Sequence, residues 1–399
     1  MGASVRDVEL ALEGLVSLAS KGLQQIELKD IYHVMKELGV GGYASVFMVK
    51  DRKTDVRMAL KVLDRKRTTE RNFLMEFSIS FLLSSHPNII GSYGIAFKTQ
   101  DHFAFAQELS PVGDLFSLIL PHTGLPEDTV KRCAAQISSA LEFIESKGMV
   151  HLDIKPENVL VFDQDCHCIK LTDFGLAHVK GKAIHARSGS ASYMAPEMCQ
   201  LADQDSLLVD STLDVWAFGV VLYCLLTGEF PWQMALPRDK AYSRFAEWQT
   251  HTPTDNPPSP WDRLPTGVLR MFSHLLAIDF NQRSKSNEVL MFMDESWDSD
   301  RSCDNKVDAK DNCPAESDPS CVHQTSNSSK DESNTVTDAS PSCESIPSAT
   351  SSMSCHLYSC SSGSQCEEAS DPRQKHALNP EMLMEDDVFL HVGAEVEIG

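Results

Sequence analysis

The stretch that decides the fold runs from Val150 to Leu160 and reads Val-His-Leu-Asp-Ile-Lys-Pro-Glu-Asn-Val-Leu. It carries a carboxylate at Asp153, a cation at Lys155 and an amide at Asn158, and another carboxylate follows at Asp173. We expect Asp153 to accept the proton of a substrate hydroxyl and Lys155 to offset charge on a transferring phosphoryl group. Asn158 and Asp173 supply the oxygen ligands that magnesium prefers. The pattern therefore predicts phosphoryl transfer from ATP.

A glycine-rich segment lies upstream, between two strand-like runs, and consists of Gly39, Val40, Gly41, Gly42, Tyr43, Ala44, Ser45 and Val46. An ordinary hairpin turn is one interpretation. The strand-loop-strand setting excludes the dinucleotide fingerprint, which needs a helix after its glycines. The segment also fits a flap whose backbone amides lie over ATP phosphates, because small residues let the main chain approach that closely.

A lysine stands in the middle of the apolar run Met58-Ala59-Leu60-Lys61-Val62-Leu63. Burying its charge is costly unless the charge is paired. One interpretation is a surface lysine whose stem is buried. The other is a lysine that holds the α- and β-phosphates and is fixed by a glutamate on the helical stretch that follows. Glu76 is the first candidate for that ion pair, and Glu70 is the alternative.

Together these motifs resemble the protein-kinase catalytic domain, over residues 32–293. The resemblance implies an α+β fold with a small β-rich N-lobe and a larger helical C-lobe. Ala195-Pro196-Glu197 resembles the end of the activation segment, and Arg283 resembles the arginine that pairs with Glu197. Asp214 resembles the aspartate that braces the catalytic loop from a buried helix. Ala44 departs from the pattern, which has a third glycine there.

The resemblance also implies a nucleotide pocket and an acceptor preference. Gln107 falls at the gatekeeper position, the backbone of Glu108 and Ser110 would meet the adenine edge, and Ala59 would line the cofactor site. Asp114 stands where a carboxylate contacts the ribose. Ser190 matches the position where serine/threonine kinases place a hydroxyl beside the catalytic aspartate and lysine, which implies serine and threonine acceptors.

Within that superfamily the C-terminal half resembles the SH3-binding-domain kinase family. The resemblance rests on the segments 193–200, 214–220, 226–232 and 269–277. The family name implies proline-rich SH3 ligands, yet the tail has few prolines. Pro257-Pro258-Ser259-Pro260 lies inside the expected catalytic domain without a well-spaced arginine, so the sequence argues against SH3 binding.

Leu152 departs from the many kinases in which an arginine precedes the catalytic aspartate. Such an arginine pairs with a phosphate on the activation loop, and leucine cannot make that contact. The loop is short and basic, with Lys180, Lys182 and Arg187. We hypothesise that activity does not need phosphorylation of the loop, and substitutions at Ser188 would test this.

Composition limits the partners and the location. The formal net charge of -22 over 399 residues argues against a nucleic-acid or anionic-membrane partner, because either needs a basic surface. The first residues lack a secretory signal, and Arg6 stands where a myristoylation motif has Ser or Thr. The apolar run 215–226 is too short to span a bilayer. The 12 cysteines show neither a disulfide frame nor a zinc spacing. We expect a cytoplasmic protein with no membrane span.

Four segments are expected along the chain. Residues 1–30 form an N-terminal extension with an amphipathic helix, whose apolar residues are Leu10, Leu12, Leu15, Val16 and Leu18. Residues 31–109 and 110–295 form the N-lobe and the C-lobe. Residues 296–399 form a serine-rich acidic tail that should be disordered, because it cannot bury enough apolar surface to offset its ordering entropy. A short docking motif is one interpretation of 382–392.

Two other functions remain open at this point. In a pseudokinase the same fold would act as a binding scaffold, but Lys61, Asp153, Asn158 and Asp173 are all present. In an adaptor protein the acidic tail would bind partners, which is compatible with catalysis by the folded domain.

Overall fold

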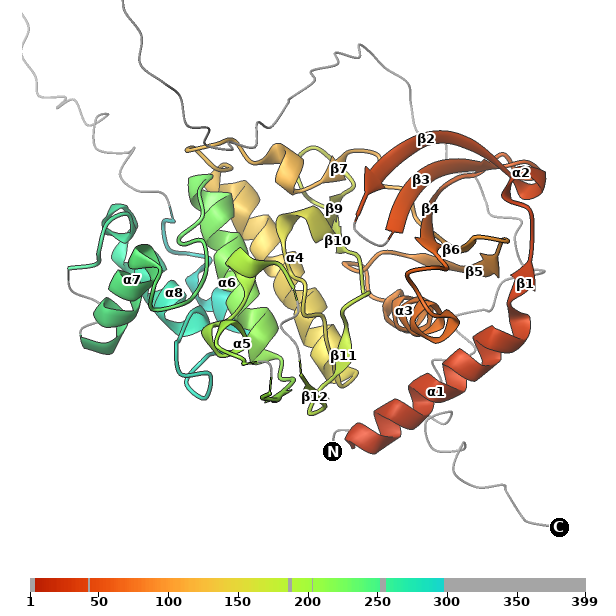
Figure 1. Cartoon of the computed structure of the whole chain (residues 1–399). Coiled ribbons are helices and arrows are strands. Elements are labelled where there is room, and N and C mark those ends of the chain that lie inside the picture. The colour runs from red at the N-terminus through yellow and green to blue at the C-terminus, as the bar shows by residue number, and fades with distance from the viewer. Residues whose placement is uncertain (1–3, 42–43, 186–188, 203, 252–255, 298–399) are drawn as a thin grey trace, which may run out of the picture. The chain divides into compact units, whose positions relative to one another are not determined.

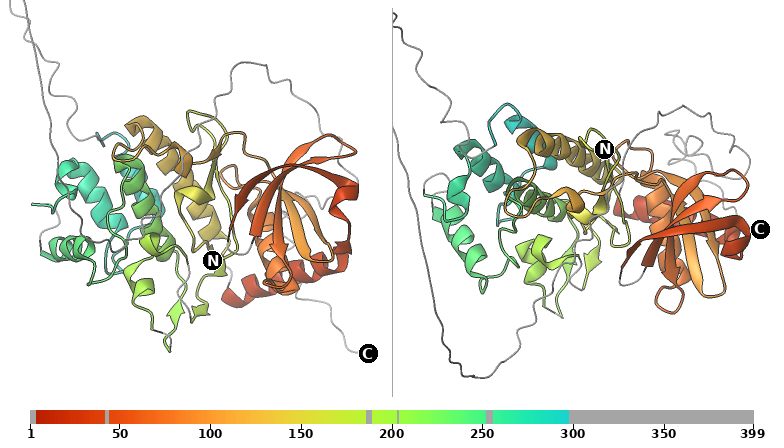
Figure 2. Two further views of the ribbon diagram at one scale, coloured as in Figure 1. Left: turned by 45° about the horizontal axis from the view of Figure 1, so that its top comes forward. Right: turned by 90° about the horizontal axis from the view of Figure 1, so that it is seen from above.

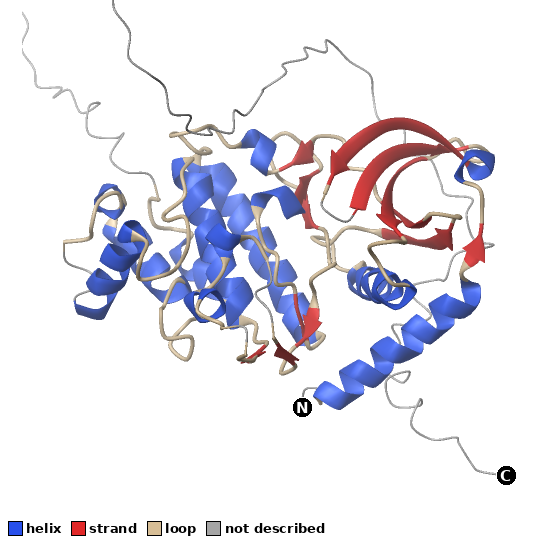
Figure 3. Cartoon of the chain, viewed as in Figure 1, coloured by secondary structure: helices blue, strands red, loops and turns tan. Residues whose placement is uncertain are grey.

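The structure is a computed structural model that describes residues 4–41, 44–185, 189–202, 204–251 and 256–297. The described chain has a sheet-rich N-terminal lobe followed by a mainly helical C-terminal lobe (Figures 1 and 3). The predicted fold class is confirmed for this part of the chain. Gly42, Tyr43, Arg187, Ser188 and nearly all of the acidic tail lie outside the described residues.

The N-terminal lobe is built around one six-stranded sheet with the strand order β1-β5-β6-β4-β3-β2. Only the β1–β5 pair is parallel. In this register Lys61 of β4 lies opposite Val46 of β3 and Phe105 of β6. The elements are α1 (Val5–Gly22), β1 (Gln24–Gln25), α2 (Leu28–Ile31), β2 (Tyr32–Val40), β3 (Ala44–Asp51), β4 (Arg57–Asp64), α3 (Glu70–Leu83), β5 (Ser92–Lys98) and β6 (His102–Gln107).

The two faces of this sheet bury different apolar residues because side chains alternate along a strand. Leu63, Phe103 and Phe105 pack against Phe73 and other residues of α3. Residues of the opposite parity form a second core on the other face, made of Tyr32, Val49, Met58, Leu60, Phe97, Ala104 and Ala106. Lys61 and Ala59 have the parity of Leu63, so the strand directs them to the α3 side.

The C-terminal lobe is centred on α6, a helix that is apolar on all sides and almost wholly buried. Helices of this kind occur at the centre of a core rather than at its surface. The helices of the lobe are α4 (Glu127–Ser146), α5 (Pro196–Cys199), α6 (Thr212–Thr227), α7 (Lys240–His251) and α8 (Thr266–Leu275). Its strands are short, namely β7 (Gly113–Asp114), β8 (Met149–Val150), β9 (Val159–Val161), β10 (Ile169–Leu171), β11 (His178–Val179), β12 (Ala183–Ile184) and β13 (Leu207–Leu208).

The N-terminal amphipathic helix is present, and only one edge of its apolar residues is buried. Val8, Leu12 and Val16 are buried, whereas Leu10 and Leu18 are exposed. The spacing of four residues keeps the three buried side chains on one face of the helix, and Leu10 and Leu18 fall outside it. A capping box between Ser4 and Asp7 begins the helix.

Candidate active site

Three charged side chains from distant parts of the chain meet on the side of the sheet that faces α3. Lys61 Nζ lies 2.6 Å from Glu76 Oε1 and 2.8 Å from Asp173 Oδ1. Burial alone would lower the pKa of Lys61, but the two carboxylates outweigh it and the pKa is raised. Burial likewise opposes ionisation of Asp173, yet Lys61 lowers the pKa of Asp173 to about 2. The site therefore holds a charged ammonium and an ionised aspartate at neutral pH.

Helix α3 decides which glutamate meets the lysine. Thr69 caps the helix by accepting from the N–H of Asn72, and Glu70 is its first residue. Glu70 pairs instead with Lys98, at 3.1 Å, on a partly exposed face. Glu76 lies six residues further along, on the buried face, and is only 8% exposed.

The loop after β8 brings a second set of polar groups together. Lys155 Nζ lies 2.7 Å from Asp153 Oδ2, and Asn158 Nδ2 donates to the same oxygen at 2.9 Å and to Asp153 O at 2.8 Å. Ser190 Oγ donates to Asp153 Oδ1 at 3.1 Å and accepts from Lys155 at 3.1 Å. Three side chains thus surround the Asp153 carboxylate.

The loop is held in shape by a carboxylate from the buried helix α6. Asp214 accepts from the backbone N–H of His151 at 2.7 Å and from that of Leu152 at 2.8 Å. Leu152 has a φ of 64°, a left-handed conformation that is costly for a branched residue. Burial raises the pKa of Asp214, while the two N–H groups and His151 oppose that rise. The two hydrogen bonds therefore hold a strained backbone just before Asp153.

The glycine-rich segment is a hairpin between β2 and β3. Gly39 lies opposite Val46, and Val40 lies opposite Ser45. A Cβ on Gly39 would meet no atom within 4 Å, so the backbone there borders open space. The Gly41 N–H donates to Ala44 O at 2.7 Å, which closes the turn.

The link between the lobes contains two contacts that the sequence did not reveal. The Glu108 side chain accepts from the Gly91 N–H at 2.9 Å and from Lys170 Nζ at 2.6 Å. A Cβ on Gly91 would lie 2.6 Å from Glu108 Cδ, so any larger residue at position 91 would have to displace the Glu108 side chain. The Glu108 N–H also donates to Gly91 O, at 2.9 Å. These partners are far apart in sequence and carry no motif.

The remaining residues of the predicted nucleotide pocket lie around this link. Gln107 is buried and donates to Ser80 of α3 at 2.9 Å, and Ala59 lies opposite Gln107 in the strand register. Ser110 Oγ donates to Val161 O at 2.6 Å. Asp114 in β7 is half-buried and accepts from the Ser117 N–H.

The end of the activation segment is held by an ion pair, and the lysines near its start pair with carboxylates. Arg283 makes a bidentate pair with Glu197, at 2.7 and 3.1 Å, as the resemblance implied. Lys180 pairs with Glu145 at 2.7 Å and also contacts Asp210 and Ser211. Lys182 pairs with Glu9 of α1 at 2.5 Å. The described cations of this segment are therefore already matched by internal carboxylates.

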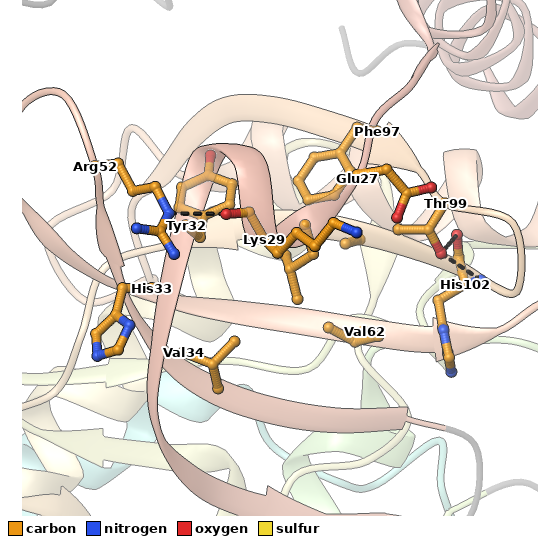
Figure 4. Close-up of a pocket in the computed structure, with 12 residues that line it drawn as sticks. Glu27, Lys29, Tyr32, His33, Val34, Arg52, Val62, Phe97, Thr99 and His102 are labelled. Carbon is orange, nitrogen blue, oxygen red and sulfur yellow. Dashed lines mark hydrogen bonds between the residues drawn. The ribbon is translucent and has the colours of Figure 1, made fainter.

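A separate pocket of about 510 Å³ lies on the other face of the sheet. It is lined by α2, β2 and the strands β4 to β6, and Arg52 Nε donates to Lys29 O at its rim (Figure 4). Val62 and Ala104 form part of its wall, and both have the parity opposite to Lys61. The predicted site residues do not line it. Among the described residues, no helix is long and apolar enough to cross a bilayer.

Comparison with known proteins agrees with this arrangement. Residues 32–293 match the protein kinase domain family. The chain is 44% identical over 286 residues to the zebrafish (Danio rerio) serine/threonine-protein kinase SBK1, which covers 72% of this chain and 74% of that protein. It is 36% identical over 294 residues to rat (Rattus norvegicus) serine/threonine-protein kinase SBK2, covering 73% and 81%. It is also 36% identical over 270 residues to Drosophila melanogaster serine/threonine-protein kinase meng-po, covering 67% and 59%.

The fold, the site and the matched domain define a protein kinase of the eukaryotic type. Within that class the chain belongs to the SH3-binding-domain kinase family, together with SBK1 and SBK2. A protein kinase domain implies ATP as a substrate and, typically, Mg²⁺.

Proposed function

We propose that the protein transfers the γ-phosphate of ATP to serine and threonine hydroxyls of protein substrates at the site formed by Lys61, Asp153, Asn158 and Asp173. The observation that carries this proposal is the charge arrangement of the cleft. The Lys61 ammonium pairs with the Asp173 carboxylate, and the Asp153 carboxylate accepts from Lys155 and Asn158; Asn158 and Asp173 carry the oxygen type that magnesium prefers. The relatives are named serine/threonine kinases, which favours the same acceptors here.

Each residue has a distinct role in the proposed reaction. Asp153 accepts the proton of the substrate hydroxyl. The hydroxyl oxygen bonds to the γ-phosphorus, and the bond between this phosphorus and the ADP oxygen breaks. Lys155 offsets charge on the transferring group, and Ser190 holds Asp153 and Lys155 together. Lys61, oriented by Glu76, holds the α- and β-phosphates. These residues act by positioning the reacting groups and by neutralising charge, as phosphoryl transfer requires.

The residues present fit a magnesium ion. Both hydrogens of the Asn158 amide are directed to Asp153, so its amide oxygen remains for the metal. Asp173 uses Oδ1 for Lys61 and for the Gly175 N–H, and offers Oδ2. When bound, magnesium would neutralise phosphate charge with these two oxygens and several phosphate or water oxygens.

The nucleotide is proposed to lie beneath the β2–β3 hairpin. Residues 39–46 would cover the phosphates with backbone amides, and Ala59 and Val46 would lie against the adenine. The Glu108 carbonyl and the Ser110 backbone would meet its edge, and Asp114 would contact the ribose. The support is the shared face of Val46, Ala59 and Lys61 in the strand register.

The test is a peptide-array assay with magnesium and labelled ATP that compares the native protein with Asp153→Asn. We expect Asp153→Asn to lose phosphate transfer while its ATP affinity stays within about twofold, because Asp153 acts on the hydroxyl rather than on the nucleotide. Transfer that persists undiminished in this variant would contradict the assignment. A cytoplasmic location is also proposed, and it is supported by Cys133, Cys166, Cys168 and Cys224, which carry free thiols.

A further inference from the structure

Helix α1 contacts α3, which carries Glu76, and also the chain segments next to Asp153 and Asp173. Figure 1 shows it running beneath α3, with its first turns next to β11, and the view in the left panel of Figure 2 agrees. Val16, in its second half, packs with Phe73, Leu74 and Phe77 of α3. Glu13 forms an ion pair with Arg71, which lies on the same helix as Glu76.

The first half of α1 contacts the turn before β8, which leads into the catalytic loop, and the activation segment. Val8 packs so closely on the turn before β8 that a Cβ on Gly148 would lie 2.9 Å from Val8 Cγ2. Val5 packs in the same way on Gly181, at 3.0 Å from the position of a Cβ. Glu9 forms an ion pair with Lys182, the residue after Gly181. One rigid helix therefore connects α3 to the two segments that carry Asp153 and Asp173.

The ion pair between Lys61 and Glu76 depends on where α3 lies. Glu76 and Lys61 are each only 8% exposed, and their atoms are 2.6 Å apart, so a shift of α3 by one or two ångströms would break the pair. In many kinases a phosphate on the activation segment provides the charge that orders these parts. Here Leu152 offers no cation for it, and Glu9 of α1 occupies Lys182.

We propose that α1 is a positioning element for phosphotransfer: its buried edge and its two ion pairs hold α3 on the activation segment, so that Glu76 orients Lys61 without a phosphate on that segment. Val8, Leu12 and Val16 are the positioning residues. The inference rests on the proposed role of Lys61.

The experiment compares two substitutions on the same helix of the full-length chain. Leu12 is 2% exposed and Leu10 is 59% exposed, so Leu12→Asp disrupts the buried edge while Leu10→Asp makes the same chemical change in solvent. We expect Leu12→Asp to lower kcat by about 10- to 100-fold, because small misplacements of catalytic groups have effects of this size. KM for the peptide should change by less than about twofold, and Leu10→Asp should keep kcat within about twofold.

Combining Leu12→Asp with Glu76→Gln separates positioning from general destabilisation. If α1 acts through Glu76, Leu12→Asp should lower kcat by less than about twofold in the Glu76→Gln background, because coupled residues are not additive. An equal loss in both backgrounds, or full activity of Leu12→Asp, would overturn the proposal. If Glu76→Gln alone has no effect, the assignment of Lys61 and Glu76 under the proposed function fails instead.

A charge exchange decides the matter if Leu12→Asp does not fold. Glu9→Lys and Lys182→Glu should each lower kcat by about two- to fivefold, since the pair is partly exposed, and the double variant should recover. Recovery supports the inference. Single variants with unchanged kcat, or a double variant that is no better than either single variant, would overturn it.

Discussion

Removing the charge of Asp214 tests how the catalytic loop is held. Asp214 accepts two backbone N–H groups, at 2.7 and 2.8 Å, and is only 4% exposed. In Asp214→Asn the amide oxygen can accept one of them, and the NH₂ group faces the other. A hydrogen bond to a buried charged group contributes about 1.5–3 kcal/mol. Burial raises the pKa of Asp214, so burying its charge is unfavourable and removing the charge recovers part of this desolvation free energy. We therefore expect Asp214→Asn to weaken the stabilisation of the loop by about 2 kcal/mol in total.

The loss should appear in turnover because the strained backbone of Leu152 leads directly into Asp153. A cost of about 2 kcal/mol corresponds to a fall in kcat of about 30-fold. The assay is steady-state phosphorylation of an accepted serine peptide, together with urea unfolding. Asp210→Asn is the comparison variant, since Asp210 accepts from the Thr212 N–H and pairs with Lys180, and the change removes one carboxylate charge away from the His151 and Leu152 backbone. The reasoning would be refuted if Asp214→Asn and Asp210→Asn had the same kcat and the same free energy of unfolding.

Three further predictions concern the activation segment. Arg283→Met leaves Glu197 without its buried bidentate partner and should lower the free energy of unfolding by about 3–5 kcal/mol, measured by urea denaturation. Burial opposes ionisation of Glu145, but hydrogen bonds from Lys180 and Ser211 outweigh it and lower its pKa below 4.5. Because the folded-state pKa is depressed, the stabilisation exists above pH 4.5 and is lost as the pH falls below it; the stability difference between the native protein and Glu145→Gln should shrink between pH 7 and pH 4. Ser188→Ala should keep native turnover in a peptide assay, whereas a loss of activity that Ser188→Asp restores would show that a phosphate is needed.

The clustering of the proposed catalytic groups could be predicted because their spacing is local. Asp153, Lys155 and Asn158 lie within one loop, so the chain itself brings them together. The fold class followed from these motifs and from the change between strand-like and helical runs. The choice between Glu70 and Glu76 could not be made from spacing alone, because it depends on which face of α3 meets the sheet.

Contacts between distant segments were beyond sequence reasoning. Gly91 packs against the Glu108 side chain, and Lys170 pairs with that side chain, yet neither Gly91 nor Lys170 belongs to a motif. The buried edge of α1 could not be predicted, because apolar content alone does not say which face is covered. Leu10 is as apolar as Leu12, and only the position of α3 and β8 distinguishes them.

The most direct measurement is an experimental structure of the protein with magnesium and a non-hydrolysable ATP analogue. The account predicts the nucleotide beneath residues 39–46, with Lys61 Nζ in contact with its phosphates. It also predicts magnesium at about 2.1 Å from Asn158 Oδ1 and from an oxygen of Asp173. A nucleotide bound instead in the pocket beside Val62, or a metal that neither Asn158 nor Asp173 contacts, would contradict it.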